Sequence, residues 1–529
     1  MISIRHLVKL GGKASSSEDA ALQPTEGFGP TSLFSREPED FDLVSQLTHM
    51  SAVATSGIAR DRLFEGTAEL EYSTSKYFRR VHRVAQRLNY DYSKACEVVA
   101  EQVKLESVQN LLLHFSTALS AGEAEIDFLE RETEVQLELY GKKYERDVES
   151  LRKWTDAYIA LMVSTTLIVV ISMVSMMIYP LGMVALVGLA FIVMMVTAAG
   201  AWIIYTVAPH EVKTHRLKRK SYEQQQMDRL GVIVITLCGP AVVGGWMLLE
   251  LGVGLILGAL LITPLGYLAW RDDRKIDERD IAVPPFLRGL GSVMGAVGTT
   301  VPEGLARLNR RSLGGLEPHV RRLFVRLSND LESSLVWARL CGETGSELVT
   351  RSVRIFAEGI RLGGDPAAVG NLAAAYAMKV SLLRSSRALV SSTFMFVVMP
   401  MHAALLGIML FVTEVVRVFG TQITEIQDQS IDSAIVQEAG VSAAISFAHP
   451  DMGFISVFVG VVIIMLTLAN AFAPYAAAGG HRFKMFVFLA CTMAMSGIAM
   501  LVIPHIVQGL FQSVSETPLT GTGTTSTVP

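Results

Sequence analysis

The sequence predicts an all-α, polytopic membrane protein with two cytoplasmic helical-bundle domains and about seven transmembrane helices. Half of its 529 residues are hydrophobic and only 18% are charged, which is typical of polytopic membrane proteins. Seven apolar runs are each long enough to cross a bilayer core of about 30 Å. Between these runs, apolar residues recur at helical spacing and no strand-like alternation is sustained.

The first 154 residues are expected to hold a leader and a soluble helical domain. The leader, 1–39, is rich in Gly, Ser, Pro and acidic residues from residue 11 on, so we expect it to be flexible. It has no apolar core of signal-peptide length, so we expect the first domain to stay on the side where synthesis occurs. That domain, 40–154, ends in a long charged helix that begins near Glu123 and passes directly into an apolar span.

Four spans are predicted within 155–270, in two pairs. The joints at Pro180-Leu181 and at Glu250 are so short that each pair is expected to form a tight membrane hairpin. The loop between the pairs, 208–230, carries a cluster of Lys and Arg and is therefore predicted to be cytoplasmic. The four spans are expected at about 157–179, 182–207, 231–249 and 251–270.

A second helical domain is predicted at 271–387, punctuated by Pro284-Pro285 and Gly314-Gly315, and three further spans follow within 388–507. The loop 418–452 and the tail 508–529 contain no Lys or Arg, whereas both domains and the basic loop contain many. The positive-inside rule therefore predicts a cytoplasmic N-terminus, an external loop and an external C-terminus.

The two helical domains align with an offset of 241 residues, which places Gly57 on Gly298 and Gly122 on Gly363. Each copy then runs onward into an apolar span, as expected of a duplication. Each of these glycines follows a predicted helix, where glycine can adopt the left-handed backbone that lets the chain turn. Only about 24 residues separate Gly363 from the next span, so we expect the second copy to lack the long charged helix and the symmetry to be only approximate.

These features together resemble the type II secretion system F domain. The resemblance is carried by the small-residue-plus-glycine turns, by FSTALSAGE and FAEGIRLGGD late in the two copies, and by the duplicated domain feeding the spans. That family includes the platform proteins of type II secretion, type IV pili, Tad pili and the archaellum. The resemblance covers about 40–179 and 282–410. The tandem arrangement, with four spans between the copies, is most similar to the archaeal platform proteins of the family.

The resemblance implies a non-enzymatic platform that couples a cytoplasmic secretion ATPase to the assembly of pilin-like subunits into a pilus or archaellum, or to type II secretion. It also implies a homodimer or small homo-oligomer among membrane lipids. Two charged surfaces are candidate partner contacts, although a solvated helix face and a topology signal would explain the same charges. The candidates are Glu123, Glu125 and Glu130 on the charged helix, and Lys213, Arg216, Lys218, Arg219 and Lys220 on the basic loop.

No catalytic residue, cofactor or metal site is expected. Gly12-Lys13-Ala14 lacks the earlier glycine and the Ser or Thr of a phosphate-binding loop, and neither HExxH nor GxSxG occurs. The four cysteines are far apart, and we expect them to be small buried or lipid-facing hydrophobic residues. The net charge of −4 gives no reason to expect nucleic-acid binding.

A small-molecule transporter or permease is the main alternative, and a membrane enzyme is a third. A transporter should place polar or ionisable residues at mid-membrane. The span interiors hold almost none apart from His402, which follows Pro400, and Asn470. We expect His402 to serve helix packing or a kink rather than to titrate. A membrane enzyme would need clustered catalytic groups, which are missing.

Overall fold

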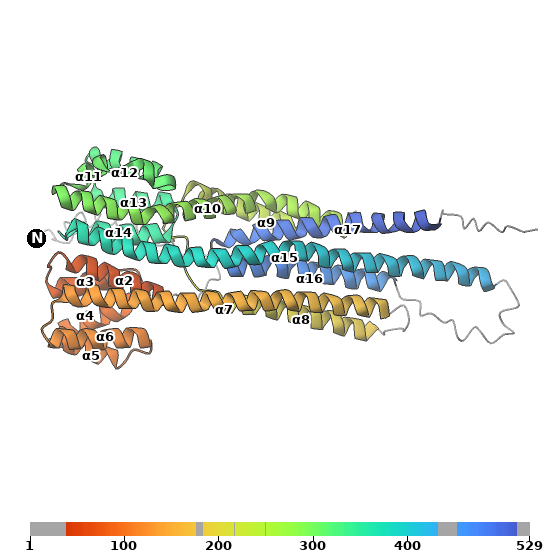
Figure 1. The fold of residues 1–529 in the computed structure, drawn as a ribbon, viewed down its shortest axis with the longest axis horizontal. Coiled ribbons are helices and arrows are strands. Elements are labelled where there is room, and N and C mark those ends of the chain that lie inside the picture. The colour runs from red at the N-terminus through yellow and green to blue at the C-terminus, as the bar shows by residue number, and fades with distance from the viewer. Residues whose placement is uncertain (1–38, 176–182, 216, 249, 432–451, 516–529) are drawn as a thin grey trace, which may run out of the picture.

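The computed structural model describes residues 39–175, 183–215, 217–248, 250–431 and 452–515 (Figure 1). Within these residues the secondary structure is helical, which confirms the predicted fold class. Short helices gather at one end of an elongated molecule, and long helices run from there toward the other end. The predicted hairpin joint at 180–181, most of the leader, most of the loop 418–452 and most of the tail lie outside the described residues.

The first bundle consists of α2 to α6 and the beginning of α7. Its core is aromatic: the ring of Phe115 lies 5.3 Å from that of Phe64 and 4.9 Å from that of Phe128. All three side chains are buried. The helices are α2 (Glu39–Ala54), α3 (Arg60–Glu69), α4 (Ser75–Leu88), α5 (Tyr92–Ala100), α6 (Glu106–Ser120) and α7 (Glu125–Ser175).

The second bundle repeats this order at the offset seen in the sequence. α6 and α14 begin and end 241 residues apart, and so do the first residues of α7 and α15, Glu125 and Pro366. Glu138 of α7 and its counterpart Lys379 of α15 form an ion pair of 2.8 Å. The helices are α10 (Leu251–Val297), α11 (Val301–Arg307), α12 (Glu317–Ser328), α13 (Ser333–Thr344), α14 (Glu347–Arg361) and α15 (Pro366–Ile431).

Two expectations about the second copy are wrong. It does have a counterpart of the long charged helix, because α15 starts at the position equivalent to the start of α7 and continues without a break into a span. Pro284-Pro285 does not punctuate the domain but lies inside α10. Proline in a helix interior costs about 3 kcal/mol, but Val283, Phe286 and Leu287 beside it are fully buried, so packing outweighs that cost.

The four glycines aligned by the repeat all have positive φ: 66° at Gly57, 74° at Gly122, 64° at Gly298 and 90° at Gly363. This is the left-handed region that other residues avoid. At the end of α10 the Gly298 N–H donates to the carbonyl oxygen of Met294 at 2.8 Å, as in a helix C-cap.

Seven helices of the described chain are long and apolar enough to cross a membrane. Three of them, α7, α10 and α15, belong partly to a bundle and partly to the membrane region (Figure 1). Each is one continuous helix, so the bundles are joined to the spans without an intervening loop. The other four are α8 (Met183–Val207), α9 (Tyr222–Leu248), α16 (Met452–Ala478) and α17 (Met485–Ser515).

Candidate functional site: a charged junction between bundles and spans

The loop between α8 and α9 is held against the second bundle. Its Thr214 forms an isolated antiparallel bridge with Ser346, and the Glu347 N–H donates to the Lys213 carbonyl oxygen at 3.0 Å. Ser346 also caps α14, because its hydroxyl oxygen accepts from the Val349 N–H at 3.2 Å. The loop thereby brings its charged side chains to the point where α10 and α15 leave the bundle.

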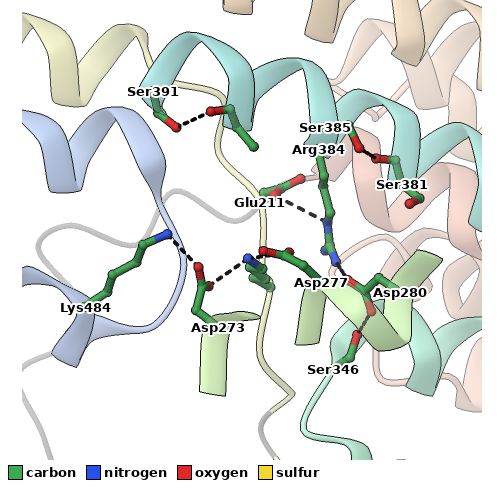
Figure 2. A network of polar contacts seen from close by, with 12 residues as sticks. Glu211, Asp273, Asp277, Asp280, Ser346, Ser381, Arg384, Ser385, Ser391 and Lys484 are labelled. Carbon is green, nitrogen blue, oxygen red and sulfur yellow. Dashed lines mark hydrogen bonds and ion pairs between the residues drawn. The ribbon is translucent and has the colours of Figure 1, made fainter. Parts of the chain in front are cut away.

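One half of the junction is centred on Asp273 of α10 (Figure 2). Its carboxylate lies 2.7 Å from the Lys213 ammonium and accepts from the Lys484 ammonium at 2.6 Å. Lys213 also lies 2.7 Å from Asp277, one helical turn further along α10. These ion pairs join the loop before α9, the helix α10 and the turn before α17.

The other half is centred on Arg384 of α15, whose side chain is 7% exposed. Its guanidinium donates to Asp280 at 2.5 Å and to the Val212 carbonyl oxygen at 3.1 Å, and it lies 3.4 Å from Glu211. Asp280 also accepts from the Ser346 hydroxyl (Figure 2). We call these residues the junction network: Glu211, Lys213, Asp273, Asp277, Asp280, Ser346, Arg384 and Lys484.

Arg387, one turn after Arg384 on α15, forms hydrogen bonds to the end of α16. Its guanidinium donates to the carbonyl oxygens of Ala477 at 2.9 Å, Ala476 at 3.2 Å and Pro209 at 2.8 Å. A cation at this position satisfies carbonyl groups at a helix C-terminus and opposes the helix dipole.

The turn after α16 must be glycine for two reasons. Gly479 and Gly480 have φ of 65° and 98°, and both approach the charged groups closely. A Cβ atom at Gly479 would lie 2.6 Å from the Arg387 guanidinium, and one at Gly480 would lie 2.9 Å from the Asp273 carboxylate. Any side chain here would strain the backbone and force the Arg387 guanidinium or the Asp273 carboxylate to shift.

Charge pairing decides the protonation state of Lys213. Burial by itself lowers the pKa of a lysine, but the carboxylates of Asp273 and Asp277 outweigh burial and raise the pKa of Lys213 above its ordinary value. Lys213 therefore stays charged at neutral pH. A buried ion network of this kind adds little net stability, but it is strongly destabilised when one partner is removed.

A second polar contact joins the two bundles to each other. Arg351 of α14 lies 4.3 Å from the ring of Phe41, is paired with Asp42 at 2.7 Å and donates to the Ser45 hydroxyl at 2.9 Å. Further along α2, His49 contacts the carboxylate of Glu358. The first helix of copy one is thus held against α14 of copy two.

A third polar set lies among the spans and includes His402. The His402 ring contacts the Asn470 amide nitrogen at 3.0 Å and the Ser496 hydroxyl at 3.1 Å, and Tyr158 donates to Asn470 at 2.9 Å. His402, Asn470 and Ser496 are fully buried. His402 therefore connects α15 to α16 and α17, and Tyr158 extends the set to α7.

The basic loop presents a smaller surface than its sequence suggests. Lys213 is 11% exposed and belongs to the junction network. Lys220 is paired with Asp228 at 2.6 Å, and Lys218 and Arg219 are exposed. Arg216 lies outside the described residues.

The acidic start of α7 is partly paired. Glu123 contacts Arg131, and Glu125 lies 2.6 Å from Arg60 of α3. Glu130 is exposed. The structure therefore does not bring the acidic and basic candidates together, and Lys218, Arg219 and Glu130 are the ones that face solvent.

Sequence reasoning missed most of the junction network, although a signal was present. Asp273, Asp277 and Asp280 are spaced i, i+4 and i+7 directly after an apolar run, which places them on one face of a helix. Arg384 and Arg387 are spaced i and i+3 directly before another run. Opposite charges at the same depth on two helices are a sign of a shared buried network.

Comparison with known proteins gives two relatives. The chain is 24% identical over 312 residues to flagella accessory protein J of Methanocaldococcus jannaschii, and this match covers 56% of the chain and 55% of that protein. It is 20% identical over 448 residues to flagella accessory protein J of Methanococcus voltae, which covers 82% of the chain and 79% of that protein. The first match thus spans about half of its relative's length.

No family model matches the chain, and no solved structure matches it. The similarity to known proteins therefore rests on these two relatives and on the tandem arrangement of bundles and spans. The chain is a multi-pass membrane protein similar over most of its length to proteins named flagella accessory protein J, in agreement with its resemblance to the archaeal form of the type II secretion system F domain family.

Proposed function

We propose that this protein is a non-enzymatic platform in the cell membrane that takes part in assembling an archaellum or a similar filament. The observation that carries the proposal is the similarity to flagella accessory protein J over 82% of the chain. The continuity of α7, α10 and α15 supports a mechanical role, because a force on either bundle is transmitted along a helix into the membrane.

We assign the bundles and the N-terminus to the cytoplasm and the C-terminus to the outside. This assignment rests on the Lys and Arg of the bundles and the basic loop, and on their absence from the sequence of 418–452 and 508–529. The proposed partners are a cytoplasmic secretion ATPase on the bundle side, pilin-like subunits among the spans, membrane lipids and a further copy of the chain.

A pull-down with the host's secretion ATPase tests the coupling. We expect the detergent-solubilised protein to retain the ATPase, and Lys218→Ala with Arg219→Ala to weaken retention if the basic loop is the contact. Lys213 is left unchanged because its replacement would disturb the junction network. Arg80→Ala with Arg87→Ala removes two exposed charges from α4 of the first bundle and serves as the matched control.

The outcomes distinguish whether the basic loop contacts the ATPase from whether the protein binds the ATPase at all. Equal retention by both variants would move the contact to the bundles. Absence of binding by folded wild-type protein would contradict the ATPase coupling and favour the permease alternative.

A further inference from the structure

A polar pocket of about 570 Å³ lies between the start of α9, the helix α10 and the helix α12. This volume is within the range of small-molecule binding sites. None of the residues of the junction network lines the pocket. Four cationic side chains do: Lys220 just before α9, Lys275 and Arg279 on α10, and Arg322 on α12.

Three of these four cations already have a carboxylate partner. The ion pairs are Lys220 with Asp228, Lys275 with Glu223, and Arg322 with Glu343. Arg279 differs, because no carboxylate forms an ion pair with it among the residues that the structure describes. Arg279 is therefore the cation that the pocket leaves for a ligand.

Arg279 is buried without full compensation of its charge. Only 6% of the residue is exposed. Burial lowers the pKa of Arg279, although the carboxylates of Asp272 and Glu223 act in the opposite direction. A guanidinium carries five N–H donors, and Arg279 uses one of them on the Thr344 carbonyl oxygen. An anion in the pocket would supply both the missing charge and the missing acceptors.

His319 of α12 provides a second donor to the same pocket, and it is 7% exposed. Its Nδ1 lies 2.9 Å from Arg322, which can only donate, so the neutral ring carries its proton on Nε2. The described residues offer this Nε2–H no hydrogen-bond partner. Burial and then the charges of Arg279 and Arg322 lower the pKa of His319, so cations dominate the potential at this point of the pocket.

We propose that this pocket binds a phosphate group, with Arg279 and Lys275 as charged donors and the His319 Nε2–H as a neutral donor. A phosphate monoester offers several strong acceptor oxygens and carries close to two negative charges at neutral pH. The planar fork of a guanidinium matches that geometry. The proposal does not depend on the proposed function.

Two sources of phosphate can reach the pocket. On α10, Tyr267 and Trp270 are 55% and 45% exposed near the end of the apolar run, as in the aromatic belt of a membrane interface. Lys275 follows Trp270 by five residues, about 7.5 Å along the helix, so it lies near the depth of the lipid head groups. Its side chain is also 33% exposed, so a soluble phosphate compound can reach it as well.

Binding measurements on the full-length chain test the proposal and distinguish the two sources. The protein is freed of lipid in a neutral detergent and titrated at constant ionic strength with inorganic phosphate, with micelles that carry phosphatidic acid, and with micelles that carry oleate. Oleate is anionic but contains no phosphate. We expect saturable binding of at least one phosphate probe and none of oleate. Binding of phosphatidic acid alone would identify a lipid head group, and binding of inorganic phosphate would identify a soluble ligand.

Variants assign the binding to this pocket. Arg279→Gln should raise the dissociation constant by roughly tenfold or more, because it removes a charged hydrogen-bond donor. Arg288→Gln, an exposed position on α10 outside the pocket, is the matched control and should leave the constant unchanged. Should Arg279→Gln fail to fold, Lys275→Gln replaces it. The proposal is overturned if folded wild-type protein binds neither phosphate probe, if oleate binds equally well, or if the pocket variant keeps the wild-type affinity.

Discussion

Asp273 connects three elements through one carboxylate. Lys213 reaches it from the loop before α9, Lys484 reaches it from the turn before α17, and the carboxylate itself belongs to α10. Only 10% of its side chain is exposed, whereas Asp277, which shares Lys213, is 48% exposed. Two aspartates one helical turn apart therefore differ in how much the fold depends on their charge.

Asp273→Asn should lower the free energy of unfolding by about 3–5 kcal/mol, because it leaves two buried ammonium groups short of a partner. Asp277→Asn should cost less than about 1 kcal/mol, since an exposed ion pair contributes little. Thermal unfolding of the two variants in the same detergent measures the difference. Equal loss in both would contradict the network as described.

His319 of α12 should make the second bundle sensitive to acid. Burial, reinforced by the charges of Arg279 and Arg322, lowers the pKa of His319 to about 3, and its Nδ1 accepts from Arg322 at 2.9 Å. Between pH 6.5 and 3 the unfolded state therefore binds a proton that the folded state does not, so stability falls as the pH falls, by at most about 1.4 kcal/mol per pH unit.

His319→Gln, which cannot titrate, should reduce that slope across the same window. Denaturation curves of both proteins between pH 7 and pH 4.5 provide the measurement. An unchanged slope would show that other groups cause the acid sensitivity.

The candidate residues show how far side-chain roles follow from sequence. Lys218 and Arg219 are exposed, as charge density on a loop suggests, but Lys213 from the same cluster is buried. The difference depends on Asp273 and Asp277, which lie about 60 residues further along the chain. Local pattern predicted the charge of the loop, whereas long-range packing decides which of its charges face solvent.

At the scale of helices, the contact between α10 and α15 depends on two glycines. A Cβ atom at Gly291 would lie 2.3 Å from the Pro366 carbonyl oxygen and 2.9 Å from Gly370 Cα. The equivalents in copy one are Met50 and Leu129, so the first copy does not use this close approach. Helix packing thus differs between the copies even though their helices keep the same register.

Gly291→Ala should force α10 away from α15 and lower stability, because the new methyl group meets backbone rather than a movable side chain. Gly66→Ala is the matched control: Gly66 lies inside α3, nothing lies within 4 Å of an added Cβ, and alanine should stabilise the helix by roughly 0.5–1 kcal/mol. Melting temperatures should therefore shift in opposite directions. A shift of Gly291→Ala in the same direction as the control would contradict the close approach.

Helix boundaries were predicted where one local signal dominates. The apolar runs fix the spans because their length alone matches a bilayer, and the seven predicted spans correspond to the seven apolar helices. Pro284-Pro285 suggested a break, yet α10 continues through it because buried neighbours on both sides hold the helix. Propensity predicts a boundary only where tertiary packing does not override it.

At the scale of the whole molecule, the two copies lie side by side, and their equivalent helices α7 and α15 run in the same direction in contact with each other (Figure 1). Helix α2 of copy one packs against α14 and α15 of copy two, through Asp42 with Arg351 and Phe41 with Tyr376. Both copies continue into the membrane through unbroken helices, and the junction network fixes α10 and α15 to the basic loop and the turn before α17. A displacement of the bundles is therefore transmitted to several spans together.

The platform function is tested by counting surface filaments by electron microscopy in cells of the source organism that lack this chain. Filaments should be absent from these cells, return with the wild-type chain and remain absent with Asp273→Asn protein that reaches the membrane at the wild-type level. Asp277→Asn should restore them. Filaments that persist in cells without the chain would contradict the platform function.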